Sequence, residues 1–233
     1  MTGGDSNVWI GREAGKLSQA ADGNTVVGYQ AAILGTATQG YNTIMGFRAG
    51  YNMPSAQQTV LIGTDAGYNI NHTDADGTVA IGYQAGYVIT TGRYNVALGY
   101  QTLMTATELD KNTAIGYQAL KVQSGSAGTG ENTAVGYRTG QAMTSGARNT
   151  LMGSGAGYAI TTAATNTLLG YSAGTALTTG GANAVLGRNA LGNATTAGYN
   201  VAVGQYAMGN IPAGVALTSA TAIGYAAFYG AAG

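Results

Sequence analysis

The feature that most constrains this chain is a five-residue motif that recurs thirteen times along it. The motif is Asn in ten of the thirteen repeats, followed by a residue that is usually β-branched, two apolar residues and Gly, as in residues 112–116. Eight of the twelve intervals between successive glycines are 17 residues long, and the others are 18, 19 or 20. A fixed period of this length indicates a solenoid in which each repeat forms one coil of a rod. The anchoring glycines are Gly11, Gly28, Gly46, Gly63, Gly82, Gly99, Gly116, Gly136, Gly153, Gly170, Gly187, Gly204 and Gly224.

The residues before each anchoring glycine favour a β-strand. The third residue before the glycine is Thr or Val in twelve repeats, with Ala184 the exception, and the next two residues are apolar. A short run of β-branched and apolar residues that ends at Gly is typical of a strand. We therefore predict an all-β parallel β-solenoid (β-roll) of 13 coils. Residues 1–233 are expected to form a single repeat domain with no separate cap, stalk or chaperone domain.

Two adjacent apolar columns have a consequence for assembly. Neighbouring strand residues point to opposite faces, so a single chain buries only one of the two columns. We predict that the residue directly before Gly is buried, and that the Thr or Val on the same strand face also points inward. The other column would form an apolar stripe longer than monomers usually expose, so we expect a parallel homotrimer to cover it. The predicted core residues are Ile10, Val27, Ile62, Ile81, Leu98, Ile115, Val135, Leu169, Leu186, Val203 and Ile223.

The composition excludes several classes of partner. Nine basic side chains balance nine acidic ones, which argues against nucleic acid because phosphate binding needs a basic patch. The apolar runs are far too short for a membrane span, so we expect no membrane insertion. The chain has no cysteine and therefore no disulfide or thiolate metal site. Residues 1–5 lack the basic and apolar regions of a secretory signal, so we expect the chain to be made without a signal peptide. It would then either stay inside the cell that makes it or leave by another route, such as release in a virus particle.

The nonapeptide at 112–120, with similar stretches at 24–32, 95–103 and 132–140, resembles the repeat of two protein groups. One is the head domain of trimeric autotransporter adhesins, and the other is a class of phage and prophage tail-fibre proteins. The resemblance implies a left-handed trimeric β-roll. The stalk and membrane barrel of the adhesins are absent, and the 17-residue spacing with Tyr-Gln after Gly fits the phage proteins better.

This resemblance predicts a structural virion protein, namely a fibre, spike or decoration segment at the virion surface or in the extracellular space. We expect other fibre or virion proteins at both ends, because neither end carries the polar cap that solenoids normally need. Two alternatives stay open. One is the head fragment of a bacterial trimeric adhesin or a self-assembling extracellular fibre protein. The other is an ice-binding solenoid, which requires a Thr column on an outer face.

Tyrosines form a column one residue after the anchoring glycine. An exposed aromatic column could stack on the sugar rings of a cell-surface polysaccharide. The same column could equally be a stacking ladder that covers the edge of the coils. A second aromatic column lies at the fifth position after Gly. The candidate ligand-binding residues are Tyr29, Tyr83, Tyr100, Tyr117, Tyr137, Tyr171 and Tyr225.

Metal binding and catalysis have little support in the sequence. Asp74 and Asp76 resemble part of a calcium loop, but Tyr83 stands where the later acidic ligand is required. We therefore expect no metal and no cofactor. His72 is the only histidine, and the chain offers no nucleophile–base pair, so we predict no catalytic residue and no enzyme activity. A carboxylate pair of the glycosidase type across chains stays open, from Asp65, Glu108, Asp110 and Glu131.

Overall fold

The computed structural model describes residues 4–16, 21–34, 40–70, 75–125, 130–212 and 215–230. The chain is an all-β parallel β-solenoid of about 12 turns with repeats of about 17 residues, which confirms the predicted fold class. It divides into two compact units. Unit 1 contains Met1–Ile115 and Ser124–Thr129, and unit 2 contains Gly116–Gln123 and Gly130–Gly233. The described residues include no helix that could cross a membrane.

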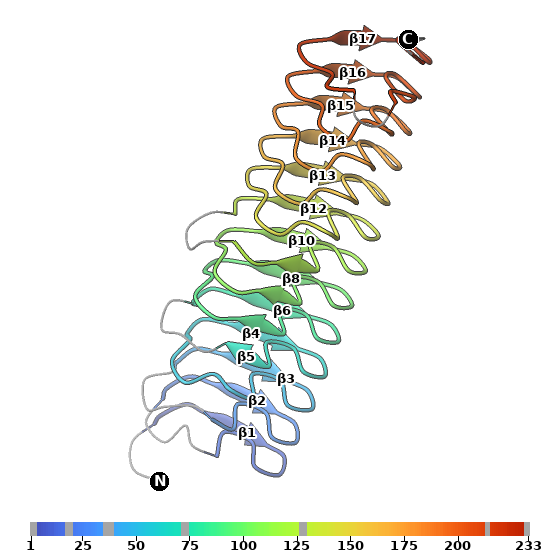
Figure 1. Cartoon of the computed structure of the whole chain (residues 1–233). Coiled ribbons are helices and arrows are strands. Elements are labelled where there is room, and N and C mark those ends of the chain that lie inside the picture. The colour runs from blue at the N-terminus through green and yellow to red at the C-terminus, as the bar shows by residue number, and fades with distance from the viewer. Residues whose placement is uncertain are drawn as a thin grey trace. The chain divides into compact units, whose positions relative to one another are not determined.

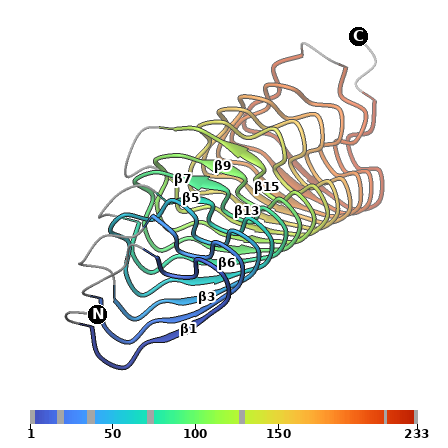
Figure 2. The ribbon, with the colours of Figure 1, turned by 90° about the horizontal axis from the view of Figure 1, so that it is seen from below.

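In unit 1, one short strand from each coil joins a parallel sheet (Figure 1). Pairing keeps equivalent repeat positions side by side, so that Val8 pairs with Thr25 and Thr25 with Thr43. A second parallel sheet lies on the opposite side of these coils (Figure 2). The first sheet contains β1 (Val8–Ile10), β2 (Thr25–Val27), β3 (Thr43–Met45), β4 (Val60–Ile62), β6 (Val79–Ile81), β8 (Val96–Leu98) and β10 (Thr113–Ile115). The second contains β5 (Asn69–Ile70), β7 (Val88–Ile89) and β9 (Thr105–Ala106).

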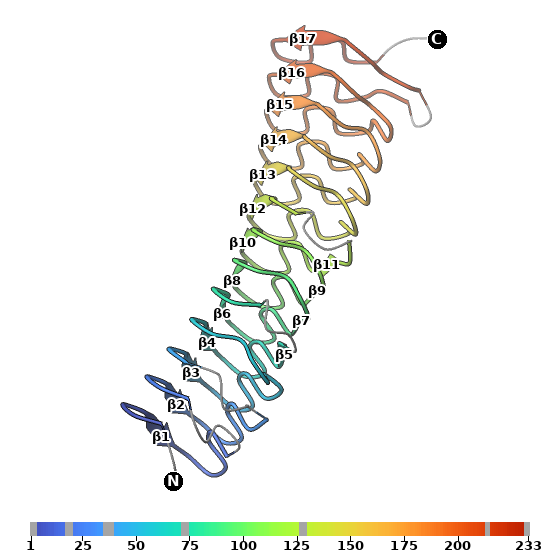
Figure 3. The same ribbon diagram turned by 90° about the vertical axis from the view of Figure 1, so that its left-hand side faces the viewer.

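In unit 2, one short strand from each coil likewise joins a parallel, in-register sheet (Figure 3). Leu151 pairs with Leu168, which pairs in turn with Val185. Identical positions of the motif therefore form straight columns along the unit. The strands are β11 (Val122–Gln123), β12 (Thr133–Val135), β13 (Thr150–Met152), β14 (Thr167–Leu169), β15 (Ala184–Leu186), β16 (Val201–Val203) and β17 (Thr221–Ile223).

The interior of the coil is lined by the second residue before Gly, which corrects the sequence prediction. In β10, Ala114 is fully buried while Ile115 beside it is half-exposed. One of the two columns does face outward as predicted, but the assignment of the columns was wrong. None of the residues predicted as core is buried: Ile10, Val27, Ile62, Ile81, Leu98, Ile115, Val135, Leu169, Leu186, Val203 and Ile223 lie half-buried or exposed on the outer face.

The narrow interior gives the physical reason for this inversion. Where the inner column has the small Ala114, the buried Leu120 fills the space. Where the inner column has the large Leu151, the position equivalent to Leu120 is Gly157, and a Cβ there would lie 3.2 Å from Cδ2 of Leu151. The total side-chain volume inside each coil is thus limited, as close packing requires. The column that is often Ala lies inside, and the uniformly large aliphatic column lies outside. The Thr or Val column shares this outer face, so its predicted inward direction was also wrong.

The asparagine at the start of the repeat forms a side-chain ladder along the stack. In unit 2, Asn166 is 1% exposed, and its backbone N–H donates to Oδ1 of Asn149 at 3.0 Å. Its own Oδ1 accepts hydrogen bonds from the backbone N–H and from Nδ2 of Asn183, at 3.0 and 2.8 Å. Its Nδ2 donates to the carbonyl oxygen of Gly180 at 3.1 Å. Each asparagine therefore joins neighbouring coils and satisfies buried backbone groups at a turn.

Candidate functional site

The tyrosine column after the anchoring glycine is exposed and stacked. Ring centroids lie 5.5 Å apart for Tyr29 and Phe47, 5.1 Å apart for Tyr83 and Tyr100, and 5.2 Å apart for Tyr117 and Tyr137. These distances are those of offset-stacked aromatic pairs. All seven candidate tyrosines have more than a third of their surface exposed: Tyr29, Tyr83, Tyr100, Tyr117, Tyr137, Tyr171 and Tyr225.

A second stacked column runs beside the first in unit 1. The Tyr68 ring lies between Tyr51 and Tyr87, with 5.0 Å between centroids on each side. Burial is the largest of the effects that raise the pKa of Tyr87, followed by the charges of Tyr68 and Asp65. The two columns together cover one corner of the coils with aromatic rings.

The first column is interrupted in unit 1, where Thr64 stands between Phe47 and Tyr83. The guanidinium of Arg48 fills this region, since its Cζ lies 4.9 Å from the Phe47 ring centroid and 5.2 Å from that of Tyr68. Arg48 forms an ion pair with Asp65, in which Nη2 donates a hydrogen bond to Oδ2 at 3.1 Å and Nε lies 2.9 Å from Oδ1 without hydrogen-bond geometry. Burial disfavours the charged arginine, but the hydrogen bond and charge of Asp65 outweigh this and raise the pKa of Arg48.

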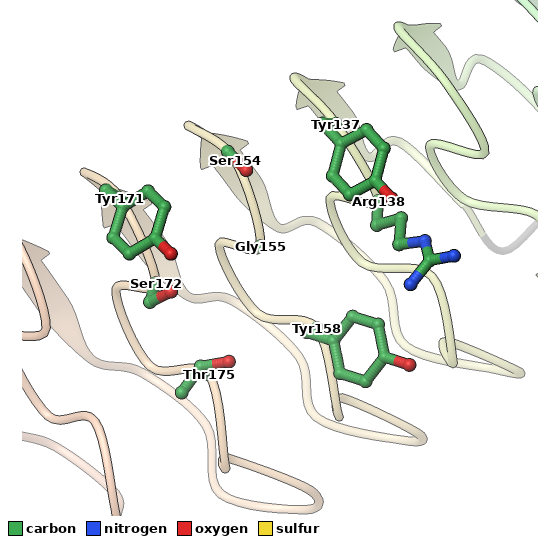
Figure 4. A pocket seen from close by; sticks show the side chains of 8 residues that line it. All are labelled: Tyr137, Arg138, Ser154, Gly155, Tyr158, Tyr171, Ser172 and Thr175. Carbon is green, nitrogen blue, oxygen red and sulfur yellow. The ribbon is translucent and has the colours of Figure 1, made fainter.

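The column is interrupted again in unit 2, where Ser154 stands between Tyr137 and Tyr171. Here a groove of about 240 Å³ opens on the surface, which we call the Ser154 slot (Figure 4). Arg138 lies at its edge, with Cζ 5.1 Å from the Tyr137 ring centroid. The residues that line the Ser154 slot are Tyr137, Arg138, Ser154, Gly155, Tyr158, Tyr171, Ser172 and Thr175.

Arg138 lacks the partner that its equivalent in unit 1 has. Its Nε is buried and makes no hydrogen bond within the described part of the chain. No carboxylate lines the Ser154 slot. The sequence itself indicates that Arg138 has few possible carboxylate partners nearby. Residues 132–233 contain no Asp or Glu but three arginines, Arg138, Arg148 and Arg188. The overall neutrality of the chain hides this local excess of positive charge.

The other candidate positions are dispersed. Asp76 uses Oδ1 to accept a hydrogen bond from the backbone N–H of Gln57 at 2.7 Å. Asp74, the other carboxylate of the suggested calcium loop, and His72 lie outside the described residues. Oδ1 of Asp110 accepts the backbone N–H of Arg93 at 2.8 Å. Among the residues that the structure describes, no three His, Cys, Asp or Glu side chains form a group that could hold a metal ion.

Comparisons with known proteins provide no relative from which to transfer a role. No protein-family model matches this chain, and neither a curated protein nor a solved structure matches it. The interpretation of the tyrosine columns and of the Ser154 slot therefore depends on their own geometry.

Proposed function

We propose that this chain is a structural fibre protein that assembles as a parallel homotrimer, as a fibre, spike or decoration segment of a phage particle. The observation that carries the proposal is the apolar outer face of the strands. Leu98 in unit 1 and Leu186 in unit 2 are 42% and 53% exposed, and each belongs to a column of Ile, Leu, Val and Met. The neighbouring outer column adds Thr and Val.

Water contact with such a face is unfavourable. Burying an exposed leucine contributes about 1.5–3 kcal/mol, so a column with one aliphatic residue per coil provides a large driving force for association. In-register columns suit a parallel partner, because identical residues then meet at the same height. The resemblance to phage fibre repeats favours three copies around one axis. The exposed tyrosines would then be presented repeatedly along the assembly to cell-surface polysaccharide.

Light scattering coupled to size-exclusion chromatography tests the assembly. Leu186→Lys together with Leu169→Lys places two charges on the outer face without altering the buried column. We expect this variant to keep its β-sheet circular dichroism spectrum and to fall to the mass of one chain. Tyr199→Lys is the matched control, because Tyr199 is 73% exposed and lies outside the strands. An unchanged oligomer in the double variant would contradict the proposal.

A specific observation also favours the ice-binding alternative. Thr133, Thr150 and Thr167 occupy the same position in three successive strands, and all lie on the outer face. A regular Thr array on an outer sheet face is what that function requires. Thermal hysteresis of the purified chain tests it: a measurable freezing-point gap would favour ice binding, whereas its absence would exclude it.

A further inference from the structure

We propose that the Ser154 slot binds a carboxylate-bearing pyranose ring, such as a uronic acid unit of an acidic polysaccharide. The tyrosines of the slot hold the faces of the sugar, and Arg138 pairs with its carboxylate. This inference deepens the glycan-binding part of the proposed function and does not require the trimer.

A comparison of the two interruptions shows what the slot lacks. Arg48 and Arg138 both stand two residues after an anchoring glycine, and each is followed one coil later by a missing ring. In unit 1 the next coil supplies Asp65 to the arginine, whereas in unit 2 the equivalent residue is Gly155. The unit 1 interruption therefore carries its own carboxylate, to which Nη2 of Arg48 donates a hydrogen bond. No carboxylate lines the unit 2 interruption, where the buried Nε of Arg138 makes no hydrogen bond. A carboxylate supplied by a ligand would restore the missing pair.

The spacing of the rings matches the thickness of a sugar. Neighbouring rings in this column stack one coil apart, as Tyr117 and Tyr137 do at 5.2 Å. Tyr137 and Tyr171 are two coils apart, which corresponds to about 10 Å at the usual strand spacing of about 4.8 Å. A puckered pyranose ring that contacts an aromatic face on each side at about 3.5–4.0 Å fits this gap.

Hydroxyl groups and charge complete the match. Ser154, Ser172 and Thr175 line the slot with hydroxyls, which can donate to and accept from sugar hydroxyls. Arg188 lies over Tyr171, with Cζ 5.9 Å from the ring centroid, so a second cation stands close to the slot. With no acidic residue from 132 onward, nothing nearby in the sequence repels an anionic polymer.

Substitutions at Gly155 test most directly whether Arg138 pairs with the carboxylate of a ligand. A Cβ at Gly155 would meet only Oγ of Ser172, at 3.5 Å, so there is room for a side chain. The φ of Gly155 is +68°, and Asp65 adopts φ 55° at the equivalent position of unit 1. Gly155→Asp should therefore fold and supply Arg138 with an internal carboxylate. Gly155→Asn has the same shape without the charge and is the matched control.

The test is isothermal titration calorimetry of the full chain with tetragalacturonic acid and with its methyl ester, which keeps the ring but removes the charge. We expect the acid to bind at least tenfold more tightly than the ester. Gly155→Asp and Arg138→Gln should each weaken binding of the acid at least tenfold, and Gly155→Asn should weaken it clearly less. Ser154→Tyr, which completes the tyrosine column, should abolish binding.

Several outcomes would overturn the inference. Equal binding of acid and ester, no binding of either, or equal effects of Gly155→Asp and Gly155→Asn would each do so. The molar mass of every variant is measured in parallel. If Arg138→Gln lowers the oligomer mass, the slot accepts a carboxylate from another copy of the chain and the inference is wrong, while the proposed assembly stands. If the wild-type chain is a monomer that binds the acid, the assembly is wrong and the slot assignment stands.

Discussion

Replacement of one ladder asparagine, Asn166→Ala, should destabilise the chain far more than an ordinary polar substitution. The change removes the acceptor of the Asn183 backbone N–H and the donor to the Gly180 carbonyl oxygen. Both groups lie in the interior of the stack. Leaving a buried polar group unpaired costs about 1–3 kcal/mol, so two such groups give a loss of about 2–6 kcal/mol.

Thermal unfolding followed by circular dichroism measures this effect. For a chain of this size, 1 kcal/mol corresponds to about 2–4 °C in melting temperature, so we expect a decrease on the order of 10 °C. Asn193→Ala is the control, since its side chain donates to Oδ1 of Asn210 in an exposed position at 3.2 Å. The control should change stability by less than about 0.5 kcal/mol. Equal melting temperatures for the two variants would refute the structural role of the ladder.

Three further predictions follow from the packing. Ser154→Tyr should stabilise unit 2 by about 0.5–1.5 kcal/mol through stacking between two rings, measured by urea unfolding; a loss of stability would contradict the ring spacing. Because burial raises the pKa of Tyr87 above its ordinary value of 10.0, the contribution of Tyr87 to stability should be constant below pH 10 and should be lost as the pH rises further. Tyr87→Phe should reduce that alkaline loss, and an unchanged profile would refute the assignment. Leu168→Ala should cost about 2–5 kcal/mol as a cavity in the core, whereas Leu169→Ala should mainly weaken assembly; the reverse order would invalidate the identification of the core column.

The sequence predicts the coil well because its period and its strand motif are local properties. The asparagine ladder and the stacked tyrosines also follow directly, since any in-register stack places identical residues side by side. Which face of each strand points into the coil could not be predicted from the sequence. Alternation shows only that neighbouring side chains on a strand point to opposite faces. The larger aliphatic residues such as Ile115 suggested the interior, yet the coil is narrow and accepts Ala114 instead.

The Ser154 slot could not be predicted from the residues that repeat in every coil. The positions that interrupt the repeated tyrosines include Thr64 and Ser154, and these two are more informative than the tyrosines themselves. The significance of Gly155 emerges only when Arg138 is compared with the Arg48–Asp65 pair, because this requires knowing that the two side chains meet across neighbouring coils. The sequence shows that no acidic residue occurs from 132 onward, but the net charge of zero for the whole chain does not reveal this local excess of positive charge.

The central claim is that the outer apolar face of the strands is an interface between copies of this chain. Sedimentation equilibrium of the purified, unmodified protein tests it most directly. A parallel homotrimer should sediment as a single species with three times the 23.2 kDa mass of one chain. A stable, soluble species of 23.2 kDa across the concentration range would contradict it.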